Sequence, residues 1–171
     1  MSRRTAKSAN WIERYFGMRA WNKTDSSILV ILLLAAVALG WYYPSIPSEV
    51  PSHYGLNGKV DAFSPKVFLW EIYGILVSLQ LILYFVGKTN PRFYNYPFKI
   101  REENRERVLR ATVRLLNELR IFILLLFLLI IGFSLFSMER IPIWFLLVTI
   151  LVPILLTIKG IILIYKANKP N

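Results

Sequence analysis

The sequence predicts an all-α integral membrane protein in which four transmembrane helices form a single domain over residues 1–171. Composition is the first observation, because 56% of the residues are hydrophobic and 18% are charged. The second is a set of four apolar stretches that approach or exceed the length needed to cross a hydrocarbon core of about 30 Å. The third is the crowding of Lys and Arg into alternate segments between these stretches. Together they indicate a polytopic membrane protein.

The segment ahead of the first span is predicted to contain a helix lying in the inner membrane interface, over residues 11–21. Its apolar residues share one helical face, and they are Trp11, Ile12, Tyr15 and Phe16. Side chains with capping oxygens follow directly before the first apolar stretch, at Thr24, Asp25 and Ser26. We therefore expect a break and a new helix start there.

We place the four spans at 27–43, 67–86, 121–137 and 143–165, with an outer loop at 44–66 and a cytoplasmic segment at 87–120. The first span imitates a secretory signal, since basic residues precede it and the triplet 36–38 reads Ala-Val-Ala. Its basic leader is long for a signal peptide, so we expect this span to persist.

Orientation follows from the distribution of Lys and Arg. Six precede the first span, nine lie between the second and third spans, and two follow the fourth. The other two loops carry only Lys59, Lys66 and Arg140. The positive-inside rule therefore places both termini in the cytoplasm.

The cytoplasmic segment is predicted to become helical from Lys99 and to continue as one helix into the third span. Glutamates and arginines recur there at the i,i+4 spacing that stabilises helices, as Glu103 with Arg107 and Glu106 with Arg110. Arg107, Arg110 and Arg114 fall on one side of this helix. We interpret them as a stripe facing anionic lipid headgroups, with phosphate or an acidic partner as the alternative.

Polar residues inside the spans are functional candidates, because charge is costly in hydrocarbon. Glu71 lies near the outer end of the second span, and its expected neighbours are in the outer loop. Gln80 and Lys159 lie deeper, at about the same level. For Lys159 we favour an extended side chain that reaches Glu118 or the inner headgroups over a place in an ion or proton route.

The outer loop has definite local chemistry. Prolines favour extended backbone in its first part, and Gly55, Asn57 and Gly58 favour a turn, so we expect a folded loop with a short hairpin around residues 56–59. His53 is the single histidine of the chain. We favour a structural role for it, hydrogen-bonded to Asp61 or to backbone, over proton transfer or metal binding.

The loop also resembles a bacterial membrane family of unknown activity that forms the N-terminal part of SdpI-like toxin-immunity proteins. The matching residues are Pro47, Pro51, His53, Tyr54, Gly58, Asp61, Phe63 and Lys66. The stretch 90–116 is similar to the cytoplasmic part of family members. In the best-known relatives, the resemblance implies immunity to a secreted toxic peptide, coupled to sequestration of a transcriptional repressor at the membrane.

The leading hypothesis is a non-enzymatic protein of the bacterial inner membrane whose outer loop contacts a peptide or another membrane protein. The residues expected to bind this partner or to organise the loop are His53, Tyr54, Gly58, Asp61, Phe63, Lys66 and Glu71. The alternative is a small transporter or ion-conducting subunit that uses Glu71, Gln80 and Lys159.

The chain has no cysteine, which excludes thiol chemistry, and its carboxylates lack metal-ligand spacing around the histidine. We therefore expect no catalytic residues, cofactor or metal. The net charge of +11 is segregated to one side of the spans, which favours lipid headgroups over nucleic acid as partners. The sequence is compatible with an oligomer and does not fix the number of subunits.

Overall fold

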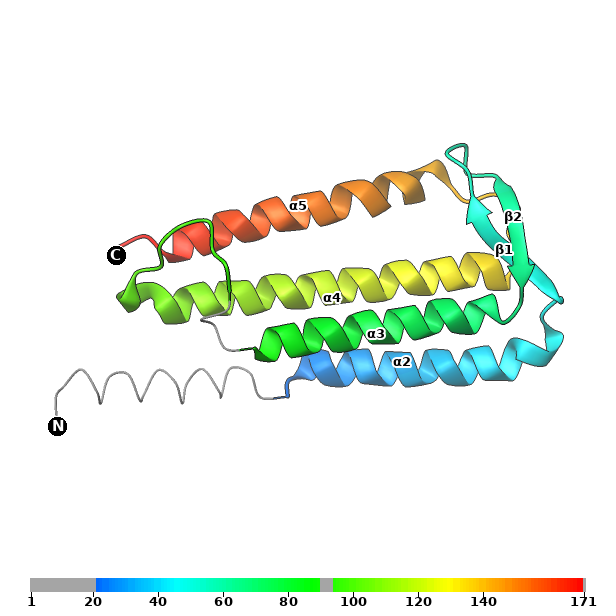
Figure 1. Ribbon diagram of the computed structural model, residues 1–171, viewed down its shortest axis with the longest axis horizontal. Coiled ribbons are helices and arrows are strands. Elements are labelled where there is room, and N and C mark those ends of the chain that lie inside the picture. The colour runs from blue at the N-terminus through cyan, green and yellow to red at the C-terminus, as the bar shows by residue number, and fades with distance from the viewer. Residues whose placement is uncertain (1–20, 90–93, 171) are drawn as a thin grey trace.

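The computed structural model describes residues 21–89 and 94–170, in which long helices lie side by side and a β-hairpin crosses one end (Figure 1). The elements in chain order are α2 (Lys23–Tyr42), η1 (Tyr43–Ser45), β1 (Glu49–Tyr54), β2 (Val60–Pro65), α3 (Phe68–Lys88), η3 (Glu102–Asn104), α4 (Arg105–Leu135) and α5 (Ile143–Ala167). The start of α2 and the end of α5 both lie toward the opposite end. We call these the hairpin end and the terminal end.

Within the described ranges, four helices are long and apolar enough to cross a membrane, which confirms the four predicted spans. The chain is thus a multi-pass membrane protein. The longest helix, α4, has 31 residues, or about 46 Å, and exceeds the hydrocarbon thickness by several turns. The predicted interfacial helix at 11–21 lies outside the described residues except for Trp21.

Helix α4 occupies the centre of the arrangement, with α5 against one side and α3 against another (Figure 1). Leu76 of α3 and Leu124 of α4 pack with Ile28 and Leu32 of α2, which attaches α2 to this pair. A second core cluster lies nearer the hairpin end. Apolar side chains cover most outward helix surfaces, as expected where lipid replaces water as the solvent.

The prediction of an all-α fold needs one correction, because residues 49–65 form a two-stranded antiparallel sheet. The predicted hairpin is therefore longer than the turn around residues 56–59. Its register pairs Glu49 with Pro65 and Tyr54 with Val60, with two irregularities between them. The reason is physical: backbone that leaves a helix must satisfy its N–H and C=O groups in another way, and cross-strand pairing does so locally.

Helix boundaries also differ from the sequence prediction at the terminal end. Helix α4 begins at Arg105 after a short 3-10 turn, rather than at Lys99. The Asn168 side chain explains this, because it accepts from the Arg101 N–H at 2.9 Å and donates to the Lys99 carbonyl at 2.9 Å. Those backbone groups are satisfied outside a helix and do not require one.

The N-terminal cap of α2 is Asn22, one residue before the helix begins. Its side chain accepts from the Asp25 N–H, and the Asp25 carboxylate accepts from the Asn22 N–H, each at 3.1 Å. This reciprocal pair is a capping box. Asp25 therefore does contribute to the helix start, but as the third helical residue rather than as the cap.

Close packing between α4 and α5 depends on Gly160, since a Cβ built there would lie 2.4 Å from a Leu115 methyl carbon. We expect Gly160→Ala to destabilise the protein by about 1–2 kcal/mol, because the leucine must leave its place. Gly74→Ala is the matched control: a Cβ there meets no atom within 4 Å, and alanine favours helix by about 0.5–1 kcal/mol. Reversible unfolding in detergent measures both. Equal stability of the two variants would contradict this account of the α4–α5 contact.

Candidate functional site

The hairpin is rooted in the protein core through its first strand. Val50 is fully buried, and Pro51 beside it is also buried. Val50 packs in a cluster with Leu39 of α2, Leu69 of α3 and Ile131 of α4. The first strand therefore shares a core cluster with residues of three helices, which fixes the position of the hairpin relative to the bundle.

The hairpin tip is fastened to the turn between α4 and α5. Gly58 accepts from the Ile141 N–H at 2.8 Å, and the Val60 N–H donates to the Glu139 carbonyl at 3.0 Å. The Tyr54 hydroxyl donates to the Met138 carbonyl at 3.1 Å. Burial raises the pKa of Tyr54 above its ordinary value, so this donor keeps its proton. Tyr54 and Gly58, expected from the sequence to bind a partner or to organise the loop, hold the hairpin in place through these hydrogen bonds.

The hairpin base is closed by Lys66. Its ammonium donates to the carbonyls of Tyr43 and Ile46, at 3.1 and 3.3 Å, and lies 4.7 Å from the centre of the Tyr43 ring. Lys66 therefore closes the hairpin on the chain leaving α2, where the Tyr43 carbonyl also accepts from the Ile46 N–H at 3.3 Å.

The outward surface of the hairpin carries an exposed polar pair and two apolar side chains. His53 Nδ1 lies 2.5 Å from Asp61 Oδ1, with the two side chains 68% and 51% exposed. Phe63 is 61% exposed and Leu56 is 93% exposed. Because an exposed ion pair or hydrogen bond contributes at most about 1 kcal/mol, His53 and Asp61 add little to the hold on the hairpin. These four side chains form what we call the hairpin surface.

Glu71 lies in the first turn of α3 and is exposed. Within the described ranges, no hydrogen bond or ion pair joins it to His53, Lys66 or Arg140. In the same ranges, no group of three or more His, Cys, Asp or Glu residues is placed to hold a metal ion.

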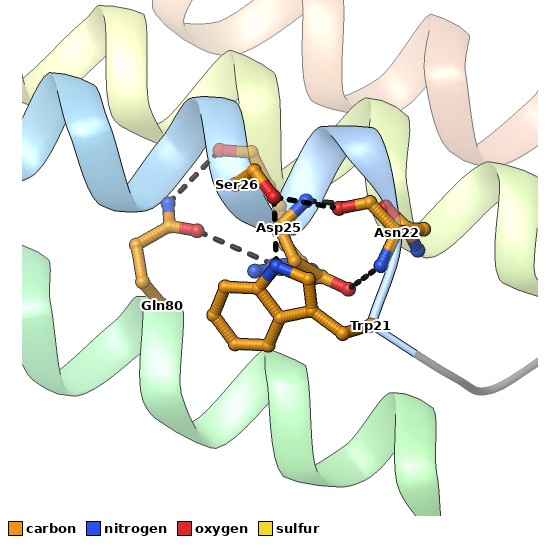
Figure 2. Close-up of polar contacts among 6 residues, drawn as sticks. Trp21, Asn22, Asp25, Ser26 and Gln80 are labelled. Carbon is orange, nitrogen blue, oxygen red and sulfur yellow. Dashed lines mark hydrogen bonds and ion pairs between the residues drawn. The ribbon is translucent and has the colours of Figure 1, made fainter.

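A second polar site, of which the sequence had indicated only Gln80 as a functional candidate, lies toward the terminal end between α2, α3 and α4 (Figure 2). Arg120 donates to Asp25 at 2.6 Å, with their side chains only 7% and 2% exposed. Gln80 donates to the Arg120 carbonyl at 2.9 Å and accepts from Arg120 Nε at 3.4 Å. Asn22 completes the set through the capping box. We call Asn22, Asp25, Gln80 and Arg120 the buried polar cluster.

An aromatic side chain and a small cavity adjoin this cluster. The Tyr84 ring lies 5.6 Å from the Arg120 guanidinium carbon and 5.8 Å from the Trp21 ring. The cavity, of about 20 Å³, is lined in part by Asp25, Arg120 and Asn117. That volume and polar lining suit one water molecule.

The intramembrane residues of the transport hypothesis are held in separate places. Gln80 belongs to the buried polar cluster, whereas Lys159 donates to Glu118 at 2.8 Å on another helix pair. The sequence predicted that the Lys159 side chain reaches either Glu118 or the inner headgroups, and the bond to Glu118 is the first of these two outcomes. A sequence signal for the buried cluster did exist, since Asp25 and Arg120 each border an apolar stretch at the same end of the spans.

The three arginines expected to form one headgroup-facing stripe have different partners. Arg107 donates to Asn104 and to the Lys169 carbonyl, at 2.5 and 2.8 Å, and so ties α4 to the end of α5. Arg110 pairs with Glu106 as predicted. Arg114 pairs with Glu118, at 3.0 Å. The predicted pair of Glu103 with Arg107 is not formed, because Glu103 pairs with Arg101 at 3.9 Å.

Comparison with known proteins finds a family model that matches part of this chain. Residues 30–77 match a family described as a domain of unknown function, DUF1648. This stretch runs from α2 through the whole hairpin into α3. A protein of Archaeoglobus fulgidus described as uncharacterized is 33% identical over 95 residues, which cover 45% of this chain and 52% of that protein.

The chain therefore spans about half the length of this archaeal relative. Because the relative is archaeal, sequences similar to this chain are not confined to bacteria. No solved structure matches the chain. The part that matches the family contains both the anchors of the hairpin and its exposed residues.

The backbone hydrogen bonds between the hairpin tip and the α4–α5 turn predict that a substitution at Gly58 strongly destabilises the tip. Gly58 has φ +77°, and a Cβ there would lie 2.5 Å from the Ile141 carbonyl oxygen. We expect Gly58→Ala to cost about 2 kcal/mol and to release the hairpin tip, because neither backbone can yield. Gly55→Ala is the control, since its Cβ would meet two side-chain oxygens at 3.2–3.3 Å and a backbone oxygen only at 3.9 Å, an ordinary contact distance. Amide exchange at Val60 and Ile141 should accelerate in the first variant alone; unchanged protection would contradict the anchor.

The buried ion pair makes a second prediction. Arg120→Met should destabilise the protein by about 3–5 kcal/mol, because it leaves the Asp25 carboxylate buried without a counter-charge. The double variant Asp25→Asn with Arg120→Met should recover part of this loss. Arg110→Met, in an exposed pair on a single helix, should cost under about 1 kcal/mol. Detergent unfolding of the wild type, the single variants Asp25→Asn and Arg120→Met, and the double variant measures the coupling, and strictly additive losses would rule it out.

Proposed function

We propose that the protein is a non-enzymatic binding protein of the cell membrane whose hairpin surface contacts a peptide or another membrane protein on the outer side. Both chain termini would then face the cytoplasm, as the distribution of Lys and Arg favours. In a bacterial host this is the inner membrane. The observation that carries the proposal is a hairpin fixed at root, tip and base that still exposes His53, Asp61, Phe63 and Leu56.

The division of labour within the hairpin supports this reading. Val50, Lys66 and Gly58 fix the hairpin to the helices through burial or backbone hydrogen bonds. His53 and Phe63 contribute little to that attachment and remain exposed. A rigid support that presents a few free side chains is suited to recognition, since little conformational entropy is lost on binding.

The chemistry of the hairpin surface indicates what it would bind. Two apolar side chains exposed beyond the helices favour an apolar or aromatic contact on the partner. The neighbouring His53 and Asp61 supply a hydrogen-bond acceptor and a carboxylate beside it, which favour a polar group next to that apolar contact. Immunity to a secreted toxic peptide, implied by the resemblance to SdpI-like proteins, is one role of this kind.

Strand addition is a less suitable mode of recognition for this hairpin. Pro51 and Pro65 each lack a backbone N–H, and the pairing contains two irregularities. Such features protect the edges of a sheet against pairing with another strand. Recognition through side chains is therefore the form of binding that we propose.

Site-specific crosslinking in cells of the native host tests the proposal. A photoreactive residue at Leu56 or Phe63 should give a discrete adduct with a peptide or protein, because both side chains are exposed on a fixed support. The same residue at Ile75 or Ile150, which are exposed on the helices, is the control for contact with lipid and its neighbours. His53→Ala and Asp61→Asn should reduce the adduct several-fold. Identical adduct patterns at hairpin and helix positions would contradict a hairpin-specific partner.

A further inference from the structure

One carboxylate at the α4–α5 contact is shared by two cations. Glu118 accepts from Arg114 Nε at 3.0 Å through one oxygen and from Lys159 Nζ at 2.8 Å through the other. Arg114 and Glu118 belong to α4, and Lys159 belongs to α5. This group of three side chains therefore carries one excess positive charge.

Helix packing explains why the two cations meet at one carboxylate. Gly160 follows Lys159, and Leu115 follows Arg114, in the sequence. Leu115 packs directly over Gly160, in space that a side chain at position 160 would occupy. The contact thus brings Arg114 and Lys159 to the same side of the helix pair.

The excess charge lies at a surface where it is accessible. Glu118 is the least exposed of the three side chains, at 24%, whereas Lys159 is 46% exposed and Arg114 is 68% exposed. An arginine has five N–H donors and a lysine ammonium has three. The bonds to Glu118 use one donor of each, so further donors point away from the carboxylate.

The depth of Lys159 along α5 favours the binding of a second anion beside Glu118. It lies eight residues before the end of α5 at Ala167, or about 12 Å along the helix from the terminal end. Positive charge at such a depth is costly unless it is paired or reaches the headgroup layer. Glu118 can neutralise only one of the two cations that it contacts.

We propose that Arg114 and Lys159 form a binding site for one phosphate group of an anionic lipid in the leaflet at the terminal end. The guanidinium group of Arg114 offers paired donors to two phosphate oxygens, and the Lys159 ammonium adds a point charge to a third. Glu118 holds both cations in place without satisfying them. The acyl chains of the lipid would lie along the apolar surface of α5, where Leu155 and Ile162 are exposed.

This site differs from general attraction between basic residues and the membrane. Arg110, one helical turn before Arg114, pairs with Glu106 on the same helix, and the two charges balance. General attraction would treat Arg110 and Arg114 alike, at about 1 kcal/mol each. A built site requires Arg114 and Lys159 together.

Native mass spectrometry of the intact protein tests the site, after reconstitution in nanodiscs that contain equal amounts of phosphatidylglycerol and phosphatidylcholine. The wild type should retain one phosphatidylglycerol in preference to phosphatidylcholine. Lys159→Gln and Arg114→Gln should each reduce that retention about fivefold or more, and Lys159→Arg should restore it. Arg110→Gln is the matched control and should leave retention unchanged.

Three results would overturn the proposal. Equal retention of the two lipids by the wild type would exclude selectivity for an anionic headgroup. An equal loss in Arg110→Gln would reduce the site to general attraction. Displacement of the lipid by millimolar inorganic phosphate would assign the site to free phosphate instead. Thermal unfolding of each variant, compared with wild type, shows whether the α4–α5 contact at Gly160 persists. Loss of phosphatidylglycerol retention in a variant that unfolds at the same temperature as wild type supports the lipid site.

Discussion

The ion pair between Asp25 and Arg120 is the interaction on which the arrangement of the helices most depends. It joins the start of α2 to the middle of α4, residues that are 95 positions apart in the chain. Both side chains are almost fully buried. Because lipid offers no hydrogen bonds to a separated charge, each partner needs the other, and α2 cannot leave α4 without exposing one of them. Gln80 brings α3 into the same set of bonds.

Helix α4 is the common partner that this interaction helps to define. It contacts α3 and α5 along its length, and its end toward the hairpin supports β1. At the terminal end, Arg107 of α4 donates to the Lys169 carbonyl, and the Asn168 side chain accepts from the Arg101 N–H, so the residues that follow α5 are joined both to α4 and to the segment before it. Contacts at both ends and in the middle thus make α4 the support for α2, α3, α5, η3 and β1.

The two ends of the molecule differ in chemistry in a way that fits two kinds of contact. The hairpin end presents Phe63 and Leu56 beside a single polar pair, on a support fixed by buried and backbone contacts. The terminal end presents arginines and lysines, some neutralised by a neighbouring glutamate and others sharing one, as at Glu118. The two proposals, apolar contact at the hairpin end and phosphate binding at the terminal end, rest on this difference between the ends.

The sequence by itself determined the four spans, the Glu106–Arg110 pair and the neighbourhood of His53 and Asp61, because each follows from hydropathy, helical spacing or short loop distances. Only the tertiary structure decided which residues of the loop hold it and which remain free. The same loop motif contains His53, Phe63, Tyr54, Gly58 and Lys66. The last three bind backbone atoms of segments outside the hairpin, and no local sequence pattern identifies those partners. The same holds for Asp25 and Arg120, whose pairing depends on how helices far apart in the chain are packed against each other.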